Sequence, residues 1–275
     1  MGKETEQKQE IVNQGVHTYS QEESYVWPQE PILREQLEWF QDQKLALMVH
    51  WGMYNQLGMV ASWALSDEDA EWSRKMVDWT DDGELFKRQY RALNRAFDPV
   101  AFQPEEWAKM AKECGFRYLI LTTKHHDGFC LWDTAYTEYK TTAEECPFHT
   151  HKYADIVRAM FDAFRKEGLG IGAYFSKADW HCPDYWETEK ALTRKTTRNP
   201  TYDPKENPEA WERFRAFTRD QILELGKQYG RLDILWFDAG WVAATNGQDI
   251  RLGEIVEEVR KTQPWVLAVD RTVGG

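Results

Sequence analysis

Five apolar segments of this sequence each end in side chains that can carry out chemistry. The residues at these ends are His50, then His125 and His126, then Asp179 and Trp180, then Asp238, and finally Asp270. An acid that closes a buried segment costs desolvation free energy unless it is paired or used. Asp238 is therefore a candidate nucleophile or general base, with a structural acid bonded to a nearby loop as the alternative. Asp270 is followed by Arg271, which favours an ion pair.

The run 124–128, Lys-His-His-Asp-Gly, is the densest polar cluster in the chain. Histidine and aspartate can bind zinc or iron. However, adjacent residues of a strand point to opposite faces, so we expect that His125 and His126 do not share a metal ion. A neutral imidazole has one donor and one acceptor, which suits the hydroxyls of a ligand. The pattern favours hydroxyl binding, with a structural role for one of the two histidines as the alternative.

The apolar segments are continuous rather than alternating, which is typical of parallel strands buried on both faces. We expect strands within 45–52, 118–128, 171–180, 232–238 and 265–270. Between them, apolar residues recur at helical spacing and the ends carry proline, acids or glycine where helices begin and stop. These patterns predict helices over 104–115, 154–168, 211–230 and 253–261.

Strands alternating with helices define an α/β fold whose chemistry lies at the carboxyl ends of the strands. The chain has neither a GxGxxG turn after a strand nor a GxxxxGK[ST] loop, which argues against a nucleotide-binding sheet. The pattern favours a (β/α)₈ TIM-like barrel, with long insertions at 53–97 and 181–210 over the active face. Such a barrel needs eight strands. Because about five are found, we expect an incomplete barrel.

Composition excludes several other classes of protein. The 275 residues carry a net charge of −12, which argues against nucleic acid or an anionic membrane as a partner. No apolar run approaches the roughly 18 residues of a membrane span. Residues 1–24 are polar and predict a flexible tail without a signal peptide, so the compartment is cytoplasmic, or periplasmic or secreted if a signal was removed. Four dispersed cysteines predict neither a disulfide framework nor a zinc site.

Four motifs, taken together, resemble the α-L-fucosidases of glycoside hydrolase family 29. They are His-Trp-Gly at 50–52, Lys-His-His-Asp-Gly-Phe at 124–129, Gly-Ala-Tyr-Phe-Ser at 172–176 with Asp-Trp at 179–180, and Leu-Trp-Phe-Asp at 235–238. The resemblance extends over 25–275. The detail at 176–183 is similar to the subgroup that acts on α-1,3/4-fucosyl linkages of branched glycans.

The resemblance implies a retaining mechanism that needs no cofactor and no metal. The carboxylate at Asp238 would be the nucleophile, and a second carboxylic acid would serve as acid and then base. The positions that would line the fucose pocket are His50, Glu71, Trp72, His125, His126, Tyr174 and Trp180. Family members carry the acid/base after the next strand, so we expect it beyond Gly275, together with a C-terminal β-sandwich.

These inferences predict that 25–275 is the N-terminal part of a catalytic barrel domain that binds a fucosylated oligosaccharide. Two alternatives stay open at this point. One is a glycan-binding protein of the same fold without turnover, and the other is a metal-dependent hydrolase that uses His125, His126 and Asp127. The sequence also predicts that the 275-residue chain by itself hydrolyses natural glycosides poorly, because general acid catalysis is worth about 10²–10⁴ in rate.

Overall fold

A five-stranded parallel sheet is the centre of the computed structural model, which describes residues 27–271; the tail predicted at 1–24 lies outside them. The strands are β1 (Ala46–Val49), β2 (Tyr118–Lys124), β3 (Gly170–Ser176), β4 (Ile234–Asp238) and β5 (Leu267–Asp270). They lie in the order β1-β2-β3-β4-β5, so each strand pairs with its neighbour along the chain. All five predicted strands are confirmed, in an open sheet consistent with an incomplete TIM-like barrel.

Helices fill the connections between the strands. The α-helices are α2 (Pro31–Gln43), α3 (Ala70–Ser73), α4 (Gly83–Arg91), α5 (Pro104–Glu113), α6 (Ile156–Lys166), α7 (Thr188–Thr193), α8 (Pro208–Gln228) and α9 (Leu252–Arg260). Short 3₁₀ turns span Met53–Leu57, Trp63–Leu65, Arg74–Met76, Ala92–Ala96, Pro147–Thr150 and Ala244–Asn246. The four predicted helices are α5, α6, α8 and α9, whereas the sequence reasoning missed α2, α3, α4 and α7.

Local sequence explains where these helices begin. The Asp155 side chain accepts a hydrogen bond from the amide of Arg158 at the start of α6, and Asn207 does the same for Ala210 at the start of α8. Both α5 and α8 also carry proline in their first turn. A capping side chain satisfies an amide that has no partner inside the helix. Proline has no amide hydrogen, so in the first turn it sacrifices no hydrogen bond of the helix.

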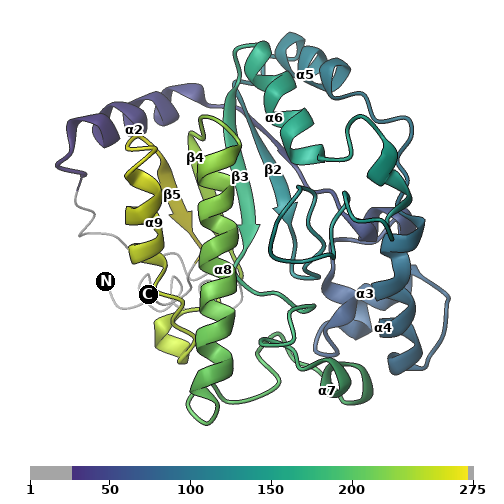
Figure 1. Cartoon of the computed structure of the whole chain (residues 1–275). Helices are drawn as coiled ribbons and strands as arrows, with labels where there is room; N and C mark the ends of the chain where they lie inside the picture. Colours follow the sequence, from purple (N-terminus) through teal and green to yellow (C-terminus); the bar gives the residue numbers. More distant parts are fainter. Residues whose placement is uncertain (1–26, 272–275) are drawn as a thin grey trace, which may run out of the picture.

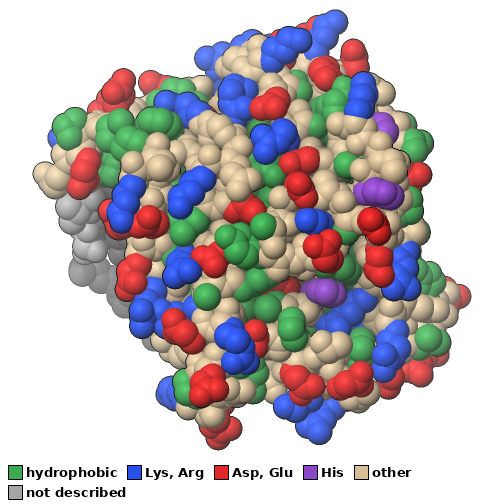
Figure 2. All heavy atoms as spheres, viewed as in Figure 1, with side chains coloured by type: hydrophobic (Ala, Val, Ile, Leu, Met, Phe, Trp, Pro, Cys, Tyr) green, Lys and Arg blue, Asp and Glu red, His purple; other side chains and the backbone are tan. Residues whose placement is uncertain are grey.

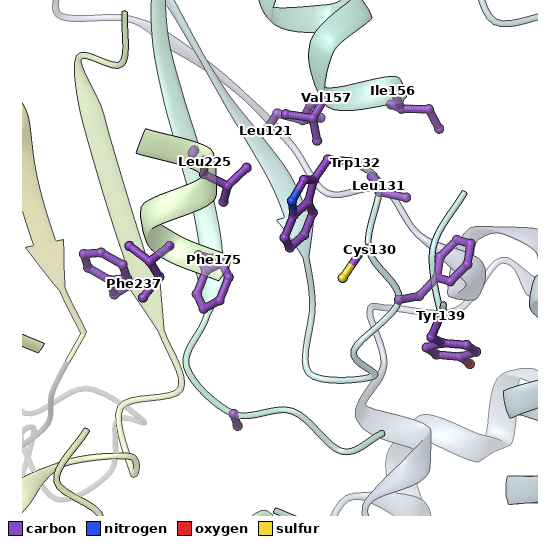
Figure 3. Packing of buried hydrophobic residues seen from close by; sticks show 14 of the residues in the cluster. Leu121, Cys130, Leu131, Trp132, Tyr139, Ile156, Val157, Phe175, Leu225 and Phe237 are labelled. Carbon is purple, nitrogen blue, oxygen red and sulfur yellow. The ribbon is translucent and has the colours of Figure 1, made fainter. Parts of the chain in front are cut away.

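The two faces of the sheet bury different sets of side chains. Leu121, Phe175 and Phe237 point toward the helices and join the large core that also holds Trp132 and Leu225 (Figure 3). On the opposite face Tyr118, Ile120, Tyr174 and Ile234 form a smaller cluster, packed against Trp39 and Phe40 of α2 and Trp236 of β4. The alternation along each strand therefore directs every second side chain toward the inner face.

All strands run the same way, so their carboxyl ends meet at one edge of the sheet. In Figure 1 the arrowheads of β2 and β3 point toward the part of the molecule that holds α3, α4 and α7. These three helices belong to the predicted insertions at 53–97 and 181–210. The long connections thus contribute the structure around the ends that carry the candidate residues.

The surface and the thiols agree with the composition. Figure 2 shows acidic and basic side chains interspersed over the viewed face, without a continuous basic area on it. All four cysteines have free thiols, and three of them are buried. No helix within residues 27–271 has both the length and the apolar character needed to cross a bilayer.

Candidate active site

Asp238 is held by donors from the two neighbouring strands. It is the last residue of β4 and is 8% exposed. The Tyr174 hydroxyl of β3 donates a hydrogen bond of 2.5 Å to Oδ2, and Nη1 of Arg271, just after β5, lies 3.2 Å from Oδ1. Burial, reinforced by the charge of Asp238, raises the pKa of Tyr174 well above its ordinary value, so the phenol stays protonated as a donor. Both carboxylate oxygens are thus fixed in direction.

Three histidines surround this carboxylate, and a hydroxyl contacts the Nδ1 atom of each ring. The Nδ1–Oγ distances are 2.9 Å from His50 to Thr122, 2.6 Å from His125 to Ser62, and 2.7 Å from His126 to Ser176. Burial lowers the pKa of His50, and it lowers the pKa values of His125 and His126 strongly. All three imidazoles are therefore neutral at pH 7 and can exchange hydrogen bonds with hydroxyls.

The arrangement of His125 and His126 differs from the geometry that we expected. Strand β2 ends at Lys124, and the chain turns at the next two residues, so the alternation of a strand does not apply to them. Their ring centroids are 4.0 Å apart. One ligating atom from each of His125, His126 and Asp238 also lies within 4.8 Å of the others. The argument that adjacent positions keep these rings apart is therefore wrong.

Aromatic rings enclose His126. The rings of Trp63, Trp180 and Trp241 lie 4.8, 5.1 and 5.0 Å from it. The predicted site residue Trp180 is fully buried and stacks on Trp186 at 4.9 Å, so it supports the site from behind rather than facing solvent. Trp63 and Trp241 are only partly buried.

Glu71 and Trp72 occupy a different environment from the other predicted site residues. Both lie on the short helix α3 and are exposed, Trp72 by 48%. The Trp72 indole donates to Asp69 at 3.3 Å. Within residues 27–271, no hydrogen bond, ion pair or ring contact joins either side chain to Asp238 or to the histidines. The structure therefore brings together His50, His125, His126, Tyr174 and Asp238, with Trp180 behind them, and leaves Glu71 and Trp72 on the insertion.

Sequence reasoning missed two residues of this site. Arg271 contacts Asp238, and the indole Nε1 of Trp236 is buried without a hydrogen-bond partner. Strand alternation was the available signal, because Leu267 and Val269 pack against the inner cluster and Arg271 continues their spacing one residue past β5. Asp270, on the other face, forms an ion pair with Lys177 at 2.5 Å. Asp270 thus forms an ion pair as expected, but the pair shown is with Lys177 rather than with the adjacent Arg271, which pairs with Asp238.

A carboxylate at the carboxyl end of a strand is where a barrel enzyme places its chemistry, and it could serve as one of the two carboxyl groups that a glycosidase uses. The family model described as α-L-fucosidase matches residues 12–275. The chain therefore belongs to the α-L-fucosidase family.

Individual relatives agree with this assignment. The chain is 30% identical over 142 residues to Alpha-L-fucosidase 1 of Arabidopsis thaliana, which covers 52% of this chain and 23% of that protein. It is 25% identical over 223 residues to the human plasma α-L-fucosidase, covering 81% of this chain and 46% of that one. The chain thus spans less than half the length of these two relatives.

Solved structures of bacterial enzymes are also similar. Alpha-L-fucosidase isoenzyme 1 from Paenibacillus thiaminolyticus superposes with a TM-score of 0.65 at 31% identity, covering 86% of this chain and 50% of that chain. A family 29 fucosidase from Bacteroides thetaiotaomicron is described as a trapped covalent intermediate with 2-fluoro-fucosyl fluoride. It superposes with a TM-score of 0.65 at 28% identity, covering 89% of this chain and 49% of that chain.

Proposed function

We propose that this chain carries the nucleophile and the sugar pocket of an α-L-fucosidase that cleaves terminal α-L-fucosyl residues. The observation that carries the proposal is the environment of Asp238, whose oxygens are both held by donors while three neutral imidazoles face the same site. A carboxylate at a strand end, oriented and only 8% exposed, is suited to nucleophilic attack.

In this mechanism an oxygen of Asp238 attacks the anomeric carbon, and the bond from that carbon to the leaving oxygen breaks. A covalent fucosyl ester forms, and water then attacks the same carbon and releases the carboxylate with retention of configuration. Tyr174 and Arg271 orient the attacking carboxylate, while His50, His125 and His126 bind hydroxyls of the sugar. The bacterial relative described as a trapped covalent intermediate supports this route.

The leaving oxygen requires a proton from a second acid, and we propose that this acid lies outside residues 27–271. The in-chain alternative is Glu71, which is exposed on α3 and has no contact with the carboxylate of Asp238 in the described part of the chain. A chain without the acid should still cleave fucosyl fluorides and aryl fucosides that carry good leaving groups. Unactivated oligosaccharides should react about 10²–10⁴-fold more slowly than with the acid present.

Trapping with 2-fluoro-fucosyl fluoride tests the nucleophile directly, because fluoride departs without help from an acid. The expected result is one fluorofucosyl group per chain, located on Asp238 by peptide mass spectrometry. Asp238→Asn should not be labelled, since an amide is a poor nucleophile. Asp233→Asn is a matched control just before the first residue of the same strand, where the carboxylate accepts from Gln36, Arg231 and the backbone amide of Ile171, and it should label normally. Labelling at another acid would refute the assignment.

Labelling and chelation together separate the two alternatives. A glycan-binding protein without turnover would bind fucose and stay unlabelled. A metal-dependent hydrolase would lose activity in EDTA and regain it with zinc, whereas we expect EDTA to have no effect.

We also propose that the natural substrate is α-1,3/4-linked fucose on a branched glycan. The support is the motif at 176–183, followed by the connection that holds α7 and reaches Arg198, whose guanidinium lies 4.9 Å from the ring of Trp63. Contacts from these loops to a neighbouring sugar can lower the barrier at the reacting carbon. With the acid/base supplied, Lewis-type trisaccharides should exceed simple aryl fucosides in kcat/KM; a preference for α-1,2 linkages would contradict this.

A further inference from the structure

We propose that Thr122 and Ser176 are positioning residues that place the imidazole protons of His50 and His126 on Nδ1, so that both Nε2 atoms accept hydrogen bonds from sugar hydroxyls. The inference deepens the proposed function and rests on it for the identity of the ligand. It predicts a direction for two contacts: the sugar donates and the protein accepts.

The first step concerns Ser176. Its hydroxyl contacts the backbone oxygen of Ala178 at 2.6 Å and Nδ1 of His126 at 2.7 Å. A carbonyl oxygen has no hydrogen, so the single hydrogen of the serine must point to Ala178. Ser176 can then only accept from His126, and this requires the ring proton to be on Nδ1.

Thr122 repeats this arrangement one strand away. Its hydroxyl donates to the backbone oxygen of Val49 at 3.0 Å and contacts Nδ1 of His50 at 2.9 Å. The same count of hydrogens makes His50 the donor and places its proton on Nδ1. His125 differs, because the contact of its Nδ1 with Ser62 leaves the direction of that hydrogen bond open.

Neutral rings complete the argument. Burial lowers the pKa values of both histidines below the usual range, so each ring holds one proton at pH 7. With that proton on Nδ1, Nε2 carries a lone pair. In His126 this Nε2 atom is buried and has no hydrogen-bond partner. A buried acceptor without a donor is costly, and a ligand hydroxyl would remove that cost.

The surroundings of His126 indicate which side chains move when a ligand reaches its Nε2 atom. Solvent reaches part of His50, whose ring is only partly desolvated, whereas the ring of His126 lies among the indoles of Trp63, Trp180 and Trp241 and its Nε2 atom is buried. Trp180 is fully buried and stacked, so Trp63 and Trp241, which are partly buried, are the rings that we expect to move when a sugar hydroxyl reaches Nε2. Binding should therefore change the fluorescence of Trp63 or Trp241.

Nitrogen-15 NMR of the histidine-labelled chain tests the tautomers without any ligand. We expect neutral Nδ1–H signals for His50 and His126, assigned by their loss in His50→Gln and His126→Gln. Thr122→Val should release His50 to the Nε2–H form, while Thr122→Ser, which keeps the hydroxyl, should not. Ser176→Ala should act likewise on His126. Thr218→Val, which removes a buried hydroxyl that has no hydrogen-bond partner, is the control and should change neither ring. An Nε2–H signal for either histidine in the wild type would overturn the inference.

Ligand binding tests the direction of the contacts. Fucose derivatives in which one hydroxyl is replaced by fluorine, which cannot donate, should bind about tenfold more weakly at two ring positions. Thr122→Val should reduce this discrimination at one position and Ser176→Ala at the other. If fucose binds and every fluorinated derivative binds equally well, the inference fails while the proposed function stands. If the wild type neither binds fucose nor is labelled, the proposed function fails, and the tautomers are still decided by NMR.

Discussion

Replacing Lys124 with methionine should cost this chain a large part of its stability. Lys124 is fully buried, and Asp179 is 2% exposed. The lysine Nζ donates to Asp179 at 2.7 Å and to Gln221 at 2.9 Å, and it lies 4.7 Å from the ring centroid of Phe175. The pair also connects two loops of the site, because each partner lies next to residues that contact the other loop. The backbone amide of Trp180, which follows Asp179, donates to the backbone oxygen of His126, two residues after Lys124.

The magnitude follows from these contacts. Methionine keeps the length of the stem but leaves the carboxylate of Asp179 with only the backbone amides of His181 and Cys182. Both hydrogen bonds are donated by the lysine ammonium, and a hydrogen bond to a charged group contributes about 1.5–3 kcal/mol. Removing one partner of a buried ion pair costs about 3–5 kcal/mol, which agrees with their sum. The free energy of unfolding of a single domain is about 5–15 kcal/mol in total, so this loss is a large part of it.

Urea unfolding of the 275-residue chain at pH 7, followed by tryptophan fluorescence and far-UV circular dichroism, measures this free energy. The double variant Lys124→Met/Asp179→Asn should be more stable than the sum of the two single losses predicts, by at least about 1 kcal/mol, because it buries no charge. Arg95→Met, which removes an exposed ion pair with Glu145, is the control and should change stability by less than about 1 kcal/mol.

The pH dependence provides a further check on the same pair. Burial alone would raise the pKa of Asp179, but the charge and hydrogen bond of Lys124 lower it below its ordinary value. The contribution of this carboxylate is therefore present above the unfolded pKa of about 3.9 and is lost as the pH falls through the folded value. The difference in unfolding free energy between wild type and Lys124→Met should therefore become smaller below about pH 4. The reasoning would be refuted if Lys124→Met lost less than about 1 kcal/mol of unfolding free energy at pH 7. It would also be refuted if the losses of the two single variants simply added in the double variant.

Two other predictions concern residues next to this pair. Burial raises the pKa of Asp127 to about 7, so the folded state binds a proton that the unfolded state releases above about pH 4, and its contribution to stability decreases as the pH rises from about 4 to 7. Asp127→Asn, whose amide oxygen can still accept from Tyr90, should remove this pH dependence, which amounts to up to about 4 kcal/mol of unfolding free energy at pH 7. If the melting temperatures of wild type and variant changed in parallel from pH 4 to 8, the prediction would be contradicted. Gly128→Ala should lower the melting temperature by several degrees, because Gly128 has φ +78° and a Cβ there would lie 2.3 Å from Asp179 Oδ1. Gly115→Ala, also at positive φ but with no atom within 4 Å of the added carbon, should cost less; equal losses would show that the contact is unimportant.

The sequence alone determined the strands and the end of the sheet at which chemistry is placed. The apolar run of β2 is buried at every position, as continuous apolar patterns require when both faces of a strand are covered. Parallel strands then bring their carboxyl ends together whatever the details of the loops. The contact between Tyr174 of β3 and Asp238 of β4 follows from that geometry, because residues 174 and 238 lie on the same face of adjacent strands.

Only the tertiary structure decided which side chains meet beyond the strand ends. His125 and His126 lie side by side because β2 ends at Lys124, so the alternation that would direct adjacent residues to opposite faces does not extend to them. The hydroxyls that bind Nδ1 of His125 and His126 come from positions 62 and 176, which no spacing rule connects to residues 125 and 126. Hydrogen-bond direction depends on the third partner of each hydroxyl, and that partner exists only in the folded chain.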